Sequence, residues 1–147
     1  MHKMKVTLLA IVAVSLLISC GLFNDDDSKE FLTSKTWILE KYLRNGNDHI
    51  NSINISNYKE KYYANGVFDR SYFDNIDDKL VEESGQWEFK NNEKELHVTG
   101  ISSIRNFSNN NSTLSSSLFL VNKLTEDNFN YNYENGGDNH EFRFIPE

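Results

Sequence analysis

Apolar and polar side chains alternate along most of the chain after residue 36, and a period of two residues is typical of half-buried β-strands. The run Trp37–Leu43 shows this clearly, because Trp37, Leu39 and Leu43 would share one face of a strand. Helical periodicity is faint, and the pattern suggests only one short helical turn, at Glu30–Lys35. The strands that we expect lie at 37–43, 58–63, 67–73, 85–90, 95–99, 118–123, 129–133 and 141–145.

Turn-forming residues separate these runs at short intervals. Asn65-Gly66 stands between the second and third runs, where an Asn-Gly pair is the strongest short-range signal of a β-hairpin. Asn91–Lys94 and Thr125–Asn128 separate the next two pairs, whereas Ser102–Ser117, rich in Ser and Asn, predicts a long loop or a ragged strand edge. About eight strands joined mostly by short turns predict an all-β fold, either a barrel or a sandwich.

The first twenty residues have a different pattern from the rest of the chain. Lys3 and Lys5 precede the apolar run Val6–Ile18. This run is shorter than the roughly 20 residues that a transmembrane helix needs. This is the layout of a cleaved secretory signal. Its end at Cys20 resembles the lipobox of a bacterial lipoprotein, which implies that Cys20 carries a diacylglycerol and an acyl chain such as palmitate, enough for stable membrane anchoring. The alternative is a free thiol after an ordinary signal peptide.

The segment after Cys20 is acidic, with three consecutive aspartates at Asp25–Asp27. Such a block repels itself and stays solvated, so it predicts a tether. A Ca²⁺ site is the alternative, although the spacing of an EF-hand loop is missing. The acidic run resembles the surface-export signal of Bacteroidetes lipoproteins, and Gly21 fits outer-membrane sorting. We therefore expect a signal peptide at 1–19, a lipidated tether at 20–30 and one domain at 31–147, anchored in the outer membrane and displayed at the surface rather than in the periplasm.

The acidic composition narrows the choice of partners. The formal charge is −7, and loss of Lys3 and Lys5 with the signal segment would bring it to −9. Phosphate binding depends on cationic patches, so we expect no nucleic-acid partner. About 128 residues would remain, which suits one domain with a core of moderate size. Cys20 is the single cysteine, which excludes a disulfide within the chain.

Four segments of the mature chain carry a second resemblance. A first strand that opens on Lys35-Thr36-Trp37 is followed by Asn65–Phe68, Gly85–Phe89 and Lys123–Phe129. Together with the acidic tether, this layout resembles the small lipocalin-like lipoprotein domains of Bacteroidetes, over roughly Phe31–Pro146. The resemblance implies an antiparallel up-and-down barrel of about eight strands, with either a cavity or a packed core inside it. The C-terminal helix of ordinary lipocalins is missing, because the end of the chain has no helical periodicity.

Alternation places a set of large side chains inside the predicted barrel, where they would either line a ligand cavity or fill it. Glu60 and Arg70, at inward register, favour a polar, ligand-binding interior, and they would pair across the first hairpin because an unpaired buried charge is costly. The alternative for each is an ordinary surface charge. Tyr58, Leu96 and Val98 share the inward register. The candidate ligand-binding residues are Trp37, Leu39, Tyr62, Phe68, Arg70, Tyr72, Trp87, Phe89, Phe129, Tyr131, Phe142 and Phe144.

No spacing in the chain points to catalysis or to a cofactor. The histidines lie far apart without a metal-binding motif, and no nucleophile elbow surrounds a serine. Asp138–Glu141 offers side chains of the metal-binding type, but a solvated turn is the preferred interpretation. Asp77-Asp78 and Glu82-Glu83 are expected in an exposed loop between hairpins, where they would not flank a cleft as glycosidase carboxylates do. We therefore expect no enzymatic activity, no cofactor and no metal site.

The sequence predicts a lipid-anchored envelope protein whose barrel binds or carries a small apolar or amphipathic ligand. Its partners would be the membrane, through lipidated Cys20, and that hydrophobic ligand. The alternative is a non-enzymatic surface module that binds a protein or glycan through its loops in an outer-membrane complex. An enzyme whose site forms only in three dimensions is the remaining alternative.

Overall fold

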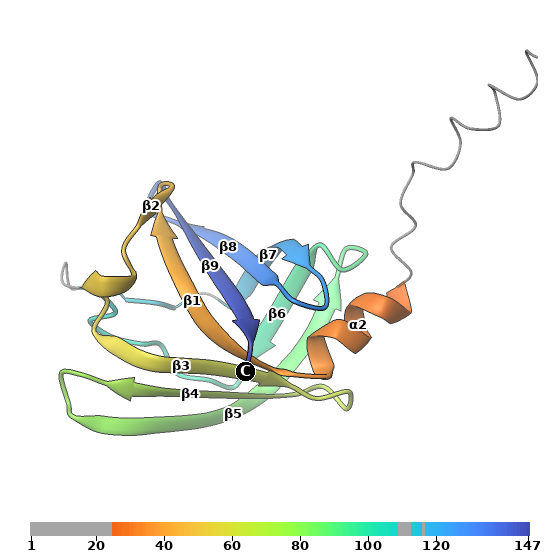
Figure 1. Ribbon diagram of the computed structural model, residues 1–147, viewed down its shortest axis with the longest axis horizontal. Coiled ribbons are helices and arrows are strands. Elements are labelled where there is room, and N and C mark those ends of the chain that lie inside the picture. The colour runs from red at the N-terminus through yellow and green to blue at the C-terminus, as the bar shows by residue number, and fades with distance from the viewer. Residues whose placement is uncertain (1–24, 109–112, 116) are drawn as a thin grey trace, which may run out of the picture.

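The computed structural model describes residues 25–108, 113–115 and 117–147, so Cys20 and the predicted signal segment lie outside the described residues. The described part of the chain forms one antiparallel sheet, which closes into a barrel because β1 pairs with β9 (Figure 1). Its elements are α2 (Asp25–Thr33), β1 (Thr36–Arg44), β2 (Asn47–Asp48), the 3₁₀-helix η1 (Ile50–Ser52), β3 (Ile55–Tyr62), β4 (Val67–Asp74), β5 (Lys79–Lys90), β6 (Glu95–Thr99), β7 (Leu118–Leu124), β8 (Phe129–Asn135) and β9 (Asp138–Pro146).

The strands follow one another around the barrel in the order β1-β3-β4-β5-β6-β7-β8-β9, and the two-residue β2 pairs with the end of β1. This order confirms the predicted antiparallel up-and-down barrel. The predicted hairpin at Asn65-Gly66 joins β3 to β4, where Tyr62 lies opposite Phe68. Gly66 has a φ of +87°, a conformation that glycine adopts without steric cost, which explains why the turn forms at this place.

β5 begins earlier than the sequence pattern indicates. Residues 79–86 pair without interruption with residues 67–74 of β4, so the strand starts at Lys79. Glu82 and Glu83 therefore lie within a strand, and the prediction of an exposed loop for this pair is wrong. Pairing with β4 satisfies the backbone of this charged stretch, while exposed Glu82 alternates with the partly buried Val81 and Glu83. Asp77-Asp78 lie in the exposed turn before β5, as expected.

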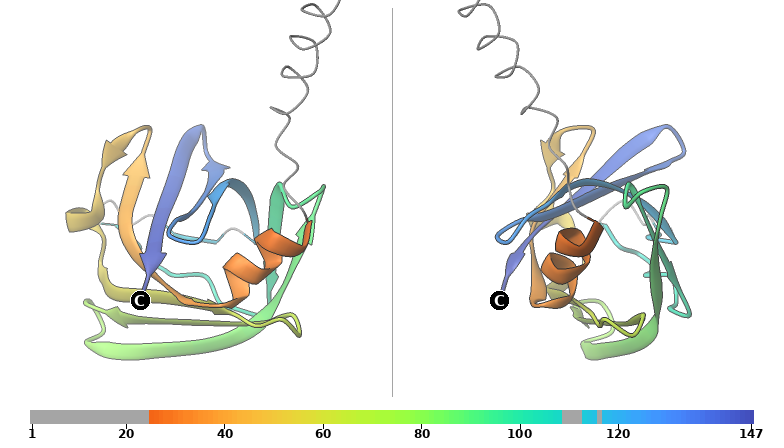
Figure 2. Two further views of the ribbon diagram at one scale, coloured as in Figure 1. Left: turned by 45° about the vertical axis from the view of Figure 1, so that its right-hand side comes forward. Right: turned by 90° about the vertical axis from the view of Figure 1, so that its right-hand side faces the viewer.

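The helix α2 covers one end of the barrel (Figure 2). Leu32 is fully buried there, and the indole Nε1 of Trp37 donates a hydrogen bond of 3.0 Å to its carbonyl oxygen. Asp25–Glu30 thus belong to a helix rather than to a tether without regular structure, while Asp27, Lys29 and Glu30 are exposed as expected. Ser28 and Leu32, four residues apart, form the buried side of the helix, and a single buried stripe suffices to dock it. No helix in the described ranges is long and apolar enough to cross a membrane.

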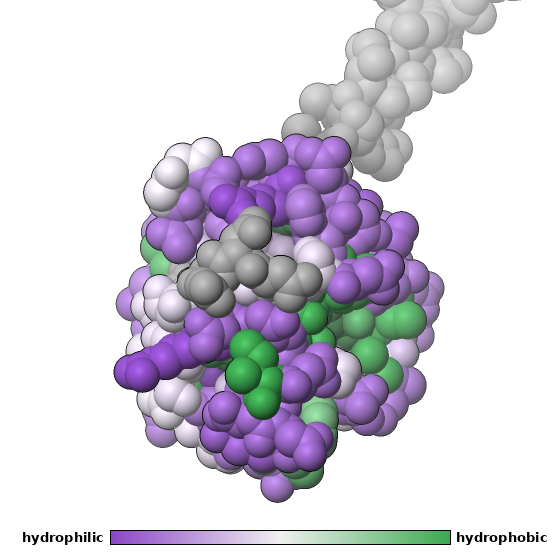
Figure 3. All heavy atoms as spheres, turned by 90° about the vertical axis from the view of Figure 1, so that its left-hand side faces the viewer, coloured by the Kyte–Doolittle hydropathy of each residue, from purple (hydrophilic) through white to green (hydrophobic). Residues whose placement is uncertain are grey.

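At the opposite end of the barrel, the segment after β6 folds back over the opening. Ile104, Phe107 and Leu114 are buried, and Ile104 and Leu114 exchange two backbone hydrogen bonds of 2.9 Å. Where the segment leaves β6, a Cβ at Gly85 would overlap the carbonyl oxygen of Thr99, the last residue of that strand, and would lie 3.1 Å from the Ile101 side chain. Figure 3 shows this end of the molecule from outside as mainly hydrophilic, which agrees with apolar loop side chains that point inward.

Aromatic rings occupy the space between the two ends. Phe129 lies against the rings of Trp37, Tyr62, Tyr131 and Phe144, with centroid separations from 5.4 to 5.8 Å. Rings at these separations are in contact and gain attraction beyond their burial. Of the two arrangements left open by the sequence, the described residues therefore form a packed aromatic core rather than a wide cavity.

Candidate ligand-binding site inside the barrel

A row of inward-facing residues crosses four neighbouring strands. Trp37 on β1 lies opposite Glu60 on β3, and Glu60 lies opposite Arg70 on β4. Arg70 in turn lies opposite Glu83 on β5. Trp37, Glu60 and Arg70 are 0%, 2% and 4% exposed, and the side chain of Glu83 is 16% exposed. Residues opposite each other in a ladder point to the same face, so charged groups of three strands meet inside the barrel.

Three tyrosine hydroxyls donate hydrogen bonds to the carboxylate of Glu60. Tyr58 and Tyr131 donate to Oε1 at 2.7 and 2.8 Å, and Tyr62 donates to Oε2 at 2.6 Å. Tyr58 and Tyr62 stand two residues before and after Glu60, so the alternation of β3 places them on the same face. Tyr131 belongs to β8, three strands away around the barrel, so its hydroxyl reaches Glu60 across the interior.

The protonation of this cluster follows from its burial. Burial raises the pKa of the Glu60 carboxyl, and the hydrogen bonds from the three tyrosines act against this by favouring the ionised form. Burial and the nearby charge of Glu60 raise the pKa of the phenols of Tyr58, Tyr62 and Tyr131 well above the ordinary value. The phenols therefore keep their protons, and the cluster is a single acceptor group surrounded by donors.

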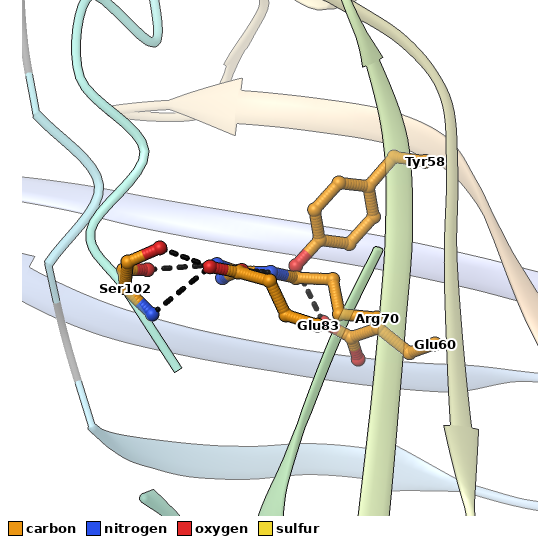
Figure 4. Close-up of polar contacts among 5 residues, drawn as sticks. All are labelled: Tyr58, Glu60, Arg70, Glu83 and Ser102. Carbon is orange, nitrogen blue, oxygen red and sulfur yellow. Dashed lines mark hydrogen bonds and ion pairs between the residues drawn. The ribbon is translucent and has the colours of Figure 1, made fainter. Parts of the chain in front are cut away.

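The guanidinium of Arg70 forms its ion pair with Glu83 (Figure 4). Nε donates to Oε2 of Glu83 at 3.1 Å, and Nη2 contacts the same oxygen and also donates to the Ser102 carbonyl at 2.7 Å. The amide and the hydroxyl of Ser102 both donate to Oε1 of Glu83. The ring of Tyr72 lies 5.5 Å from the guanidinium carbon. These contacts tie the loop after β6 to β4 and β5.

The predicted ion pair between Glu60 and Arg70 is therefore replaced by a pair between Arg70 and Glu83. Burial by itself would lower the pKa of the Arg70 guanidinium, but Tyr58 and Glu83 more than offset it, so Arg70 stays charged. Burial would raise the pKa of Glu83, but Ser102 and Arg70 lower it below the ordinary value. Glu83 is the better partner because Ser102 and partial exposure to water also stabilise its charge.

A hollow of about 270 Å³ lies beside Arg70, between the end of β6 and the loop that follows it. This is slightly less than the roughly 300 Å³ at which small-molecule pockets typically begin. Val98, Ile101 and Leu114 contribute apolar groups to its walls, and Ser102 contributes polar ones. Arg70 thus borders both the hollow and the polar cluster around Glu60.

A second buried polar group lies near the turn between β8 and β9. His140 is 4% exposed, its Nδ1 is 2.7 Å from the Tyr42 hydroxyl, and its ring stacks on Tyr133 at 4.8 Å. Burial lowers the pKa of His140. Asp138 forms an ion pair with Arg44, so Asp138 and His140 belong to the barrel wall and the expectation of a solvated turn is wrong for them. Within residues 25–108, 113–115 and 117–147, no three His, Cys, Asp or Glu side chains are grouped to hold a metal ion.

The structure brings the predicted interior residues together as a set. Leu39 and Phe89 are partly buried and pack against the core. Their role in binding a ligand stays a prediction. The remaining candidates are all buried, and they are Trp37, Tyr62, Phe68, Arg70, Tyr72, Trp87, Phe129, Tyr131, Phe142 and Phe144.

Four residues of the polar cluster are not among the predicted site residues, namely Tyr58, Glu60, Glu83 and Ser102. The inward register of Tyr58 and Glu60 is predicted, but that of Glu83 and Ser102 is not. The sequence pattern predicts a loop for Glu83. Val81, Gly85 and Trp87 occupy alternate positions on either side of it, and this period of two residues indicates that Glu83 faces the barrel interior. Ser102 carries no such signal, since it lies in a segment without any period. Its position depends on where the loop crosses the barrel.

Comparison of the sequence with models of protein families and with curated proteins gives no match. The solved structures that share the fold include the following two. Japanin from Rhipicephalus appendiculatus, solved with bound cholesterol, has a TM-score of 0.52 at 10% identity over 78% of this chain and 76% of Japanin. A lipocalin-like protein from Bacteroides uniformis has a TM-score of 0.52 at 15% identity over 80% of this chain and 99% of that protein. The chain therefore has a lipocalin-like β-barrel fold.

Proposed function

We propose that this protein is a binding protein without catalytic activity, whose barrel holds a small apolar or amphipathic ligand. The observation that carries the proposal is the carboxylate of Glu60, which is buried with three tyrosine hydroxyls in an otherwise aromatic interior. A barrel that only needs a stable core gains little from a buried charge, because its desolvation is costly. Fold likeness to Japanin, whose structure contains cholesterol, also supports a small hydrophobic ligand.

Native mass spectrometry of the protein purified under mild conditions tests this proposal. We expect an additional mass of a few hundred daltons that organic solvent removes, and displacement of a bound fluorescent dye by fatty acids or sterols. A spectrum without added mass, together with flat dye titrations for both lipid classes, would count against a ligand-binding barrel.

We further propose that lipidated Cys20 anchors the domain in the outer membrane, with surface display preferred over the periplasm. The support is the sequence of the first twenty residues and the acidic run after Cys20. Cys20→Ser should move the protein from the membrane fraction to the soluble fraction and abolish incorporation of labelled palmitate. A membrane-bound Cys20→Ser protein would disprove the anchor, and labelling of intact cells with an impermeant reagent would distinguish the two faces of the membrane.

A surface interaction module in an outer-membrane complex is the second candidate function. The β4–β5 hairpin favours it, because Ile76 in the turn and Leu80 at the start of β5 are 54% and 61% exposed. Site-specific crosslinking from position 76 in intact cells tests this alternative. A discrete adduct with an outer-membrane protein would support it, whereas crosslinks to no protein would count against it.

A further inference from the structure

The carboxylates inside the barrel outnumber the cations. Glu60 and Glu83 are the acidic members of the inward row and Arg70 is its base, and Arg70 forms its ion pair with Glu83. No Lys, Arg or His of the described residues forms an ion pair with Glu60, although this carboxylate is only 2% exposed. The charge of Arg70 favours the ionised form of Glu60 from across the ladder, but no cation contacts the carboxylate, so Glu60 stands out as a buried carboxylate without a direct ion-pair partner.

The bonding of Glu60 restricts what a ligand could offer it. Every group that contacts the carboxylate is a hydroxyl donor, with two donors on Oε1 and one on Oε2. A carboxylate has about four acceptor positions, so Oε2 can still accept from a further donor. A ligand carboxylate brings only acceptors and a like charge, whereas an ammonium group brings N–H donors and a positive charge in direct contact.

The rings around Glu60 suit a cation as well. Tyr131 lies 5.4 Å from Phe129 and 5.3 Å from Phe144, and Tyr58 lies 6.1 Å from Phe144. These rings form a continuous aromatic wall beside the carboxylate. The face of an aromatic ring attracts a cation, and the attraction is strongest where water is excluded.

Tyr131 marks the side from which the ligand's polar group would approach. Tyr58 and Tyr62 bond to Glu60 along their own strand, but the Tyr131 hydroxyl crosses the interior from β8 to reach Oε1. A donor on that side of the carboxylate would take the free acceptor position on Oε2. The three tyrosines would stay in place and orient the carboxylate.

We propose that the barrel selects amphipathic ligands that carry a protonated amine, and that the ammonium group pairs with Glu60 inside the aromatic wall. This inference rests on the proposed ligand-binding function and specifies the chemical class of the ligand. A sterol hydroxyl or a fatty-acid carboxylate in the same place would give one neutral hydrogen bond or a repulsion of like charges.

Three probes of equal chain length test this proposal, namely octylamine, 1-octanol and octanoate at neutral pH. Binding to the full chain in lipid nanodiscs is measured by calorimetry against empty nanodiscs. We expect octylamine to bind about tenfold or more tightly than the other two, since a hydrogen-bonded charge pair adds this much affinity. Glu60→Gln should remove the preference for the amine and leave binding of octanol unchanged. Glu82→Gln, an exposed carboxylate on the outer face of β5, is the matched control and should behave as wild type.

The outcomes separate this inference from the function on which it rests. Equal binding of the three probes, or a preference for octanoate, would overturn the amine inference and leave a ligand-binding barrel. Binding of none of them would count against both. The selectivity of the wild-type protein decides the question even if Glu60→Gln unfolds, and circular dichroism of each variant shows whether it is folded.

Discussion

Glu60 lies directly opposite Arg70 across the β3–β4 ladder, both side chains are inside the barrel, and yet the guanidinium of Arg70 forms its ion pair with Glu83. Arg70 stands between two carboxylates in one row, and the second is fixed by the amide and the hydroxyl of Ser102. Arg70 thus pairs with Glu83, which is the carboxylate nearer to the surface. The deeper carboxylate, Glu60, is left to tyrosine hydroxyls.

A double-mutant cycle should show that Arg70 interacts more strongly with Glu83 than with Glu60. Arg70→Met and Glu83→Gln, made singly and together, should show a coupling of about 1–3 kcal/mol in the free energy of unfolding, because the two groups are in direct contact. The cycle of Arg70→Met with Glu60→Gln should give a smaller coupling. Chemical denaturation of the six proteins measures both values, and a larger coupling with Glu60 would contradict the observed pairing.

The stability contributed by Glu60 should decrease as pH rises. Burial raises the pKa of Glu60 in the folded protein above its ordinary value of 4.5, so the folded state keeps a proton that the unfolded chain has lost. This contribution is complete below pH 4.5 and is lost as pH rises through the folded pKa. The unfolding free energy of wild type minus that of Glu60→Gln should therefore decrease as pH rises above 4.5.

Exposed Glu82 provides the control for this pH series. Glu83, whose pKa is lowered, loses stability in the acid range instead, but it contributes equally to wild type and to Glu60→Gln and cancels in the difference. Glu82→Gln should follow wild type at every pH. A difference between wild type and Glu60→Gln that stays constant or increases with pH would mean that Glu60 is ionised without cost.

Local sequence signals were sufficient for the barrel because each hairpin is specified by its own residues. Asn65-Gly66 fixes the β3–β4 turn, and strand alternation then determines that Glu60, Arg70 and Trp87 point inward. None of these inferences needs knowledge of distant segments. Local signals do not predict α2, because Asp25–Lys29 has the composition of a solvated segment. The helix is stabilised by the docking of Leu32 against the barrel, which is a tertiary contact.

The polar cluster could be predicted only in part, because it depends on how the barrel closes. Tyr131 reaches Glu60 only once β8 has come round to face β3, and no local pattern specifies which side chains then meet. Ser102 reaches Glu83 only through the path of a loop without periodicity. Alternation therefore predicts which residues enter the interior, and tertiary closure decides which of them bond.

Leu32 should be the residue that holds α2 against the barrel. Leu32→Ala removes a fully buried side chain and should cost about 2–4 kcal/mol of stability. Hydrogen exchange should accelerate in residues 27–34, while the amides of β3 and β4 keep most of their protection. Glu30→Ala, at an exposed position of the same helix, should change neither. Equal acceleration throughout the barrel would show that α2 is an integral part of the fold rather than a separately docked cover.

Gly85 should tolerate no side chain, because the backbone at the end of β6 lies too close to it. A Cβ at Gly85 would overlap the carbonyl oxygen of Thr99 on the paired strand, and neither backbone can move without breaking the β5–β6 ladder. Gly85→Ala should therefore destabilise the protein by about 2–3 kcal/mol. Gly136→Ala is the matched control, since Gly136 has a φ of +62° but open space around it, and only the backbone cost of about 1 kcal/mol should appear. Thermal unfolding of the two variants compares these costs, and equal shifts in Tm would mean that the close approach at Gly85 relaxes without cost.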